Sequence, residues 1–211
     1  MIRVIATNVS EMTDMEYRLL YEMASAERKE KAGKYHCRKD AIHCVVADAL
    51  LRYAMGASTY TVEKTVHGKP FVPGNDGFHY NLSHAGDWVV LAFDSAEVGV
   101  DVEEICGNIN IDAIVCRFFS PEEQRYVLEN SEKSIHRFYE VWVGKESYIK
   151  YLGTGLNLNL ETFSMFDLKS NVRPHSRMLD DRHIMSLCTC CDDYRFEELD
   201  ISQLLRCADS E

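Results

Sequence analysis

An apolar run, residues 88–93, is followed after a short turn by a segment, 98–103, in which apolar residues alternate with others. A continuous apolar run predicts a strand that is buried on both faces. An alternation of period two predicts a strand with one buried face. Because few residues separate the two strands, we expect them to pair as an antiparallel hairpin. The chain must therefore build a sheet around this region.

The other face of residues 98–103 carries Gly99, Asp101 and Glu103. Side chains two residues apart on a strand share one face and lie about 7 Å apart. One interpretation is the solvent face of an edge strand. Another is a cation site, because acidic residues have poor strand propensity and like charges on one face repel each other. Mg²⁺ suits such a pair, since it takes oxygen ligands and needs only one or two carboxylates.

Residues 134–152 have the pattern of a long helix, which Gly153 can end. Within it Trp142, Glu146 and Lys150 are spaced four apart and form one stripe. Taken alone, Glu146 and Lys150 also fit an ordinary helical ion pair. Gly144 interrupts the helix at a cost of about 1 kcal/mol relative to alanine. We expect its small size to permit close approach by another segment.

The remaining elements predict an α+β fold with antiparallel pairing. Helices are expected where capping residues precede an apolar stripe, and strands where short apolar or alternating runs lie between turn residues. The expected strands are 1–9, 62–72, 78–81, 162–168, 183–190 and 195–196, and the expected helices are 13–24, 40–53 with Gly56 at its end, one starting at Ser120-Pro121, and 202–206.

Composition limits the class of protein. The chain has 211 residues, of which 46% are apolar and 27% charged, as in a soluble globular protein. It has no apolar stretch long enough for a membrane span and no secretory signal at its start, so we expect a cytoplasmic protein. The net charge of −11 argues against nucleic-acid binding. An anionic ligand would therefore need a local basic patch.

Eight cysteines are scattered along the chain, and a cytoplasmic setting predicts reduced thiols. Three of them fall within residues 188–191, close to His183. A zinc site would need a second cysteine pair with finger spacing, which the sequence lacks. We therefore interpret these residues as buried strand cysteines.

Several basic or polar residues sit where an anion could bind. Lys69 precedes Pro70, which restricts its backbone to extended geometry, and Ser83-His84 follows a short strand. Each has an ordinary alternative as a loop residue. His43 lies beside the apolar stripe of its helix, where a packed histidine is the more common case. The basic residues of segment 26–36 also fit a solvated helix face; they include Arg28 and Lys31.

Taken together and in order, the motifs resemble the 4′-phosphopantetheinyl transferases of the Sfp-like, two-lobed type. They are Gly68-Lys69-Pro70, Asn81-Leu82-Ser83-His84, Gly99-Val100-Asp101-Val102-Glu103, Arg117-Phe118-Phe119-Ser120, and the segment Trp142-x-x-Lys145-Glu146-Ser147-x-x-Lys150-x-x-Gly153-x-Gly155-Leu156. The resemblance implies two pseudo-symmetric α/β lobes with antiparallel sheets, expected at residues 1–100 and 101–211. It also implies a monomer.

The implied activity is Mg²⁺-dependent transfer of the phosphopantetheine arm of coenzyme A to a serine of an apo acyl or peptidyl carrier protein, with release of 3′,5′-ADP. The carrier could belong to fatty-acid, polyketide or peptide synthesis. By resemblance, Asp101, Glu103 and Glu146 hold Mg²⁺, and Glu146 is also a candidate for the base. Lys150 then lies at the pyrophosphate.

The resemblance also assigns coenzyme A contacts, mainly to the first lobe. Ser83 and His84 would contact phosphate oxygens, and Lys69 and Pro70 would border the adenine. Arg28 and Lys31 match basic positions at the 3′-phosphate. His43 stands where the family often has arginine, which predicts weaker 3′-phosphate binding, or binding that strengthens at lower pH.

The second lobe is expected to dock the carrier protein, which is usually acidic. The residues expected to take part are Arg117, Phe118 or Phe119, Arg125 and Lys133. Two other functions remain open at this point. One is a non-catalytic module that binds coenzyme A or a carrier protein. The other is a different Mg²⁺-dependent enzyme, such as a phosphohydrolase or nuclease.

Overall fold

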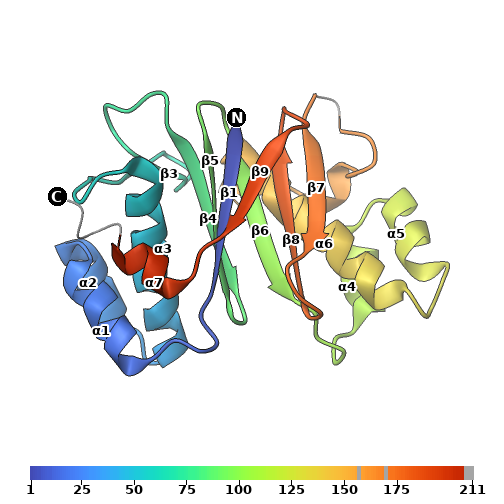
Figure 1. The fold of residues 1–211 in the computed structure, drawn as a ribbon. Helices are drawn as coiled ribbons and strands as arrows, with labels where there is room; N and C mark the ends of the chain where they lie inside the picture. Colours follow the sequence, from blue (N-terminus) through green and yellow to red (C-terminus); the bar gives the residue numbers. More distant parts are fainter. Residues whose placement is uncertain (156–157, 169–170, 207–211) are drawn as a thin grey trace.

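The computed structural model describes residues 1–155, 158–168 and 171–206, so Leu156 of the last motif and Cys207 lie outside the described residues. Two sheets pack face to face in the middle of the molecule, and helices cover the outer face of each (Figure 1). The first sheet has the order β4-β5-β1-β9, and the second has the order β6-β8-β7. The predicted α+β class with antiparallel pairing is confirmed, with one parallel pair, β1 with β9.

The first sheet contains β1 (Ile2–Asn8), β4 (His79–Ala85), β5 (Trp88–Asp94) and β9 (Tyr194–Glu198). Its outer face packs on α1 (Asp14–Met23), α2 (Ala26–Gly33), α3 (Arg38–Met55) and α7 (Ile201–Arg206). The ends of these helices follow local rules. Thr13 forms a capping box with Glu16 at the start of α1, and Gly56 ends α3 at φ 60°.

The second sheet contains β6 (Gly99–Glu104), β7 (Arg173–Met178) and β8 (His183–Thr189). Its outer face carries α4 (Ile111–Phe118), α5 (Pro121–Leu128) and α6 (Ser134–Leu152). A 3₁₀ turn, Leu160–Thr162, follows α6. The strands β2 (Glu63–Lys64) and β3 (Pro70–Phe71) form a separate two-stranded sheet. Within the described residues, no helix is both long enough and apolar enough to cross a membrane.

The inner faces of the two sheets pack directly on each other. Side chains of β1 and β5 meet those of β6 and β8 in one apolar cluster. Its buried members are Ile2, Val4, Ala6, Trp88, Val90, Ala92, Val98, Val100, Val102, Met185 and Leu187. The continuous apolar run of residues 88–93 is thus buried on both faces, as predicted, because one face meets the helices and the other meets the second sheet.

The predicted hairpin between residues 88–93 and 98–103 is wrong. Both edges of β5 are already occupied, by β4 and by β1, so β6 joins the second sheet beside β8. Side chains of β4 take the place of a neighbouring strand: Asn81 Oδ1 accepts a hydrogen bond from Val100 N at 2.8 Å, and Ser83 Oγ accepts one from Val102 N at 3.3 Å. These bonds join the two sheets.

The predicted strand at 162–168 is also wrong. Residues 160–162 form the 3₁₀ turn, and the residues up to 168 form no strand. The sequence patterns missed two elements. One is β7, which pairs with β8, and the other is α4, which packs beside α6. One buried ion pair explains the irregular segment. Lys145 Nζ lies 2.8 Å from a carboxylate oxygen of Glu123 and donates to the carbonyls of Leu160 and Phe163, so it ties this segment to α5 and α6.

The end of the chain returns to the first sheet. After β8, the chain crosses over and β9 runs parallel to β1, with Val4 opposite Phe196 (Figure 1). Leu199, Ile201 and Leu204 then enter the core of the first helical layer. The division into lobes at residues 1–100 and 101–211 stays a prediction. Residues 194–206 of the expected second lobe pack with the first sheet.

Helix α6 rests on β6 at a single glycine. A Cβ atom at Gly99 would lie 2.1 Å from the carbonyl oxygen of Ser147 and 2.3 Å from the backbone nitrogen of Tyr151. The close approach expected at Gly144 is wrong, because a Cβ there would meet side chains at an ordinary 3.5 Å. The glycine that the packing requires is therefore in the strand.

Replacing Gly99 by alanine should displace α6 from β6. Because the clash is with helix backbone, which cannot move aside as a flexible side chain can, we expect Gly99→Ala to lower the free energy of unfolding by about 3 kcal/mol, the upper end for overpacking. Gly144→Ala is the matched control, since it has room and removes a helical glycine, so it should be neutral or stabilise by up to about 1 kcal/mol. Urea unfolding measures both. Equal stabilities of Gly99→Ala and the parent chain would contradict this packing.

Candidate functional site

The site is built around a three-residue cluster that joins β4, β6 and α6. Lys150 Nζ donates to Asp101 Oδ1 at 2.6 Å and to Ser83 Oγ at 2.9 Å, and Ser83 Oγ donates to the same carboxylate oxygen at 2.9 Å. Asp101 and Ser83 are buried, whereas about a third of the Lys150 side chain, 29%, is exposed. A partly exposed ammonium is thus held at a fixed place by buried partners.

Two further carboxylates, Glu103 on β6 and Glu146 on α6, lie beside this cluster. Glu103 shares the face of Asp101 and accepts a hydrogen bond from Trp142 Nε1 at 3.2 Å. Burial, followed by the charge of Asp101, raises the pKa of Glu103 to about 7, and Glu146 adds to that effect. Burial and Asp101 also raise the pKa of Glu146. The three acids therefore repel one another, with Lys150 as their nearby cation.

These carboxylates fit a hard cation in their chemistry. Asp101 Oδ2 is buried and has no hydrogen-bond partner among the described residues, so one strong acceptor is left over. Burial is the largest cause of the raised pKa of both Glu103 and Glu146, the charge of Asp101 adds to it, and Lys150 opposes it. In the part of the chain that the structure describes, no three His, Cys, Asp or Glu side chains are already grouped closely enough to hold a metal ion.

His84 and His43 border the cluster on the side of the first sheet. Their rings lie 4.6 Å apart, centroid to centroid. Burial, followed by the charge of Lys150, lowers the pKa of His84, and Lys31 contributes to the same shift. Burial and then His84 lower the pKa of His43 to about 4. His43 is therefore a neutral imidazole near pH 7, and its Nε2 donates to the carbonyl of Gly86 at 3.1 Å.

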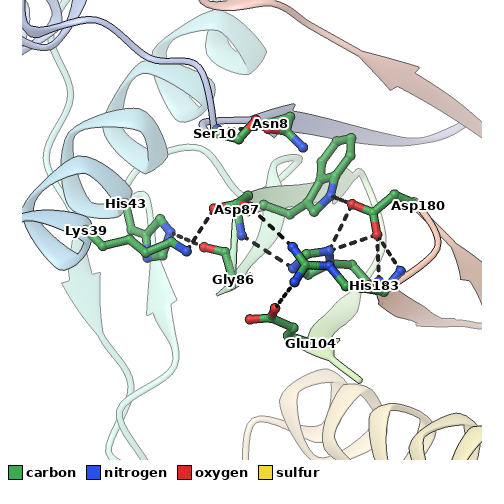
Figure 2. Close-up of polar contacts among 11 residues, drawn as sticks. Asn8, Ser10, Lys39, His43, Gly86, Asp87, Glu104, Asp180 and His183 are labelled. Carbon is green, nitrogen blue, oxygen red and sulfur yellow. Dashed lines mark hydrogen bonds and ion pairs between the residues drawn. The ribbon is translucent and has the colours of Figure 1, made fainter. Parts of the chain in front are cut away.

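The turn between β4 and β5 is held from two sides, by β8 of the second sheet and by α3 of the first helical layer (Figure 2). His183, fully buried on β8, donates from Nδ1 to Asp180 at 2.9 Å and accepts from Asp87 N at 3.4 Å. From the first helical layer, Lys39 pairs with the Asp87 carboxylate at 2.8 Å. A Cβ at Gly86 would lie 2.0 Å from His183 Nε2, so only glycine fits there. This clamp fixes the turn whose carbonyl orients His43.

Asp180 is the anchor of that clamp. Its carboxylate also accepts from Trp88 Nε1 at 2.7 Å and from the backbone nitrogens of Arg182 and His183. Burial raises the pKa of Asp180, but these hydrogen bonds outweigh burial and hold the pKa below its usual range. Asp180 is thus a firmly charged end of the network that links the two sheets (Figure 2).

Other predicted contacts are engaged elsewhere in this structure. Lys69 forms an ion pair with Glu97 and donates to the carbonyl of Tyr151 at 2.9 Å, so it bridges to the end of α6 rather than standing free. Pro70 begins β3. Arg28 lies 3.7 Å from the buried carboxylate of Asp48, which ties it to its own helical layer. Lys31 is exposed at the end of α2.

The expected docking residues divide into two groups. Arg117, Arg125 and Lys133 are exposed, and the Arg117 guanidinium lies 5.0 Å from the centre of the Phe118 ring. Phe119 is only 1% exposed and stacks on Phe138 in the core of the second layer. Phe119 therefore cannot supply an apolar docking contact, and Phe118, which is half-buried, is the remaining candidate.

The sequence patterns missed the residues that join the elements of the site. Asn81 binds β6 through its side chain, and Asp180 and His183 hold the turn beside His43. One signal was present for Asn81, because it alternates with the predicted site residue Ser83 on a strand that precedes a buried one. Nothing local marks Asp180, since its partners lie far away in the sequence.

The raised pKa of Glu103 predicts a pH-dependent stability without added metal. A carboxyl whose pKa rises from 4.5 to about 7 on folding contributes stability below pH 4.5 that is lost as the pH rises through 7. In chelator, the melting temperature of Glu103→Gln should therefore rise relative to that of the parent chain between pH 5 and pH 8. A constant difference across this range would show that Glu103 is not in this environment.

Comparison with known proteins supports one family over nearly the whole chain. A family model described as the 4′-phosphopantetheinyl transferase superfamily matches residues 97–196, and one described as 4′-phosphopantetheinyl transferase, N-terminal, matches residues 11–96. These are the segments that carry Asp101, Glu103, Glu146 and Lys150 on one side, and Ser83 and His84 on the other.

Curated relatives agree. A 4′-phosphopantetheinyl transferase of Bacillus subtilis is 34% identical over 169 residues, 76% of this chain and 69% of that protein. The 4′-phosphopantetheinyl transferase Sfp of Bacillus subtilis strain 168 is 35% identical over 67% of this chain and 65% of that protein. A Xenopus laevis L-aminoadipate-semialdehyde dehydrogenase-phosphopantetheinyl transferase is 29% identical over 69% of this chain and 55% of that protein. The resemblance of the motifs is thus confirmed, and the chain belongs to the 4′-phosphopantetheinyl transferase superfamily.

Proposed function

We propose that this protein transfers the 4′-phosphopantetheine arm of coenzyme A to a serine of an apo acyl or peptidyl carrier protein, with release of 3′,5′-ADP. The observation that carries the proposal is the Lys150 ammonium, held by Asp101 and Ser83 beside two carboxylates of raised pKa. Attack of a hydroxyl on a pyrophosphate needs positive charge at the phosphate oxygens and a base for the hydroxyl proton. Both kinds of group are present here.

Asp101, Glu103 and Glu146 would hold a Mg²⁺ ion. The unpartnered, buried Asp101 Oδ2 and the mutual repulsion of the three acids support this assignment. When bound, Mg²⁺ neutralises charge on the pyrophosphate. Because a proton competes with the cation for Glu103, magnesium binding should weaken as the pH falls through about 7.

Glu146 is the proposed base for the serine hydroxyl, directly or through a water. Its raised pKa supports this role, because a carboxylate of higher pKa takes a proton more readily. Lys150 would stabilise the charge that develops on the pyrophosphate oxygens. Its hydrogen bonds to Asp101 and Ser83 hold it in place before the substrate arrives, so little reorganisation is needed.

Coenzyme A would bind along the border between the two sheets. His84, Ser83 and Lys31 are the proposed phosphate contacts, and the effects of Lys150 and Lys31 on His84 support a local basic patch on an otherwise acidic chain. Lys69 and Pro70 are the proposed border of the adenine. For Arg28 to reach a 3′-phosphate it must release Asp48, whose carboxylate keeps a hydrogen bond from Tyr60.

A single assay separates this proposal from its competitors. The protein is incubated with coenzyme A, Mg²⁺ and several apo carrier proteins, and the carriers are weighed by mass spectrometry. We expect a gain of one phosphopantetheine arm. A binding module would leave the carriers unmodified, and a phosphohydrolase would cleave coenzyme A without any carrier; either result would overturn the proposal.

The same assay tests the role of Lys150. We expect Lys150→Met to lower kcat by about 10²-fold or more, because it removes the ammonium proposed to stabilise the charge that develops on the pyrophosphate. Lys34→Met is the matched control, because Lys34 is exposed and its ion pair among the described residues is with Glu30 of α2. We expect the kcat of this variant to equal that of the parent chain. A Lys150→Met enzyme with full activity would remove this lysine from the mechanism.

His43 gives a second expectation. Its pKa of about 4 makes it neutral across the working range, so the lower-pH strengthening allowed by the sequence should not appear above pH 5. We expect His43→Arg to lower the Michaelis constant for coenzyme A about tenfold, as a charged hydrogen bond to phosphate adds roughly 1.5–3 kcal/mol. Dephospho-coenzyme A is the control substrate, and its constant should change little. An unaltered constant for coenzyme A would sink this assignment.

The exposed arginines of α4 and α5 are the proposed docking contacts for an acidic carrier. We expect Arg117→Glu combined with Arg125→Glu to raise the Michaelis constant for the carrier about tenfold, through loss of electrostatic attraction, without changing that for coenzyme A. Arg18→Glu on α1, at the opposite end of the molecule, is the control (Figure 1). Equal effects of the two charge reversals would argue against docking at α4 and α5.

A further inference from the structure

Cys190 and Cys191 stand where the chain crosses from the second sheet to the first. They follow directly after β8, whose residues are all buried, and they precede β9, which pairs with β1. Both cysteines are exposed and free. The interpretation of residues 188–191 as buried strand cysteines is therefore right for Cys188 and wrong for these two.

Their sulfur atoms face the same side. In an extended strand, neighbouring side chains point to opposite faces, so adjacent cysteines ordinarily keep their sulfurs apart. Here the chain bends at Cys190, and the two Sγ atoms lie 3.9 Å apart. The backbone nitrogen of Cys191 donates to Thr189 Oγ1 at 3.3 Å, which holds the bend. Among the described cysteines, no other pair has a sulfur–sulfur contact.

The surroundings favour a cation. Hydrogen bonding to Cys190 raises the pKa of Cys191, and Asp94, which pairs with the N-terminal ammonium, adds to this effect while the ammonium opposes it. The exposed Asp192 and Asp193 follow directly. A ligand that replaces both thiol protons with one positive centre would relieve this crowding, and sulfur selects soft ions over hard ones.

We propose that Cys190 and Cys191 form a dithiol site that binds a soft, thiophilic ion through both sulfur atoms. The ions of this class are trivalent arsenic and soft divalent metals such as cadmium. With phenylarsine oxide as the probe, two arsenic–sulfur bonds form and the arsenic–oxygen bond breaks. The oxygen leaves as water with the two thiol protons, and arsenic stays trivalent, so no oxidant is needed.

The site lies next to the last turn of α6. The charges of Cys190, Cys188 and Glu97 each add to burial in raising the pKa of Tyr151, which directly follows Lys150. The Tyr151 carbonyl also receives the hydrogen bond from Lys69. The proposed site is nevertheless separate from the carboxylates of β6 and α6, and its test does not depend on the proposed transfer activity.

The test is mass spectrometry of the intact chain after incubation with phenylarsine oxide in the presence of excess monothiol. We expect one phenylarsenic group per chain, removed by 2,3-dimercaptopropanol but not by the monothiol. Cys190→Ser and Cys191→Ser should each weaken binding by about 10² or more, because the second bond forms at a high effective concentration. Thermal unfolding checks that both exposed substitutions keep the fold.

Matched controls use other thiols. Cys106→Ser and Cys116→Ser remove exposed cysteines without a sulfur neighbour among the described residues, and they should leave labelling unchanged. Cys207→Ser covers the cysteine outside the described residues and should also leave it unchanged. Labelling that survives in Cys190→Ser, or that is lost in Cys207→Ser, would overturn the proposal.

Discussion

The close approach of α6 to β6 at Gly99 is the constraint on which the site depends. Because no side chain fits between the strand and the helix backbone, the helix lies directly on the strand. Lys150 then reaches Asp101, and Trp142 reaches Glu103, so the stripe of the helix runs along the polar face of the strand. A larger residue at Gly99 would lift the helix and separate Lys150 from Asp101 and Trp142 from Glu103.

The same site is also the seam between two sheets. β6 cannot pair with β5, whose edges are occupied, and it is joined to β4 by the side chains of Asn81 and Ser83. Ser83 therefore binds a backbone nitrogen, the Asp101 carboxylate and Lys150 at once. The same hydroxyl joins the two sheets and holds Lys150, so the first sheet contributes directly to the cluster of Ser83, Asp101 and Lys150.

Local features of the fold followed from the sequence, because they depend on residues a few positions apart. The capping boxes at Thr13 and Ser120 and the common face of Asp101 and Glu103 are of this kind. The partner of β6 did not follow, since it depends on which edges of β5 are free, and residues 2–8 decide that. Lys145 is a similar case: its buried partners, Glu123 and the carbonyls of residues 160 and 163, come together only after α5 and α6 pack.

We propose that the carboxylates of β6 and α6 form one cation site where the two sheets meet. Crystals of the parent chain grown with coenzyme A and Mn²⁺, a scattering substitute for Mg²⁺, test it through an anomalous difference map. We expect one manganese peak that is bound by Asp101, Glu103 and Glu146. A peak held by other residues, or no peak beside a bound coenzyme A, would contradict it.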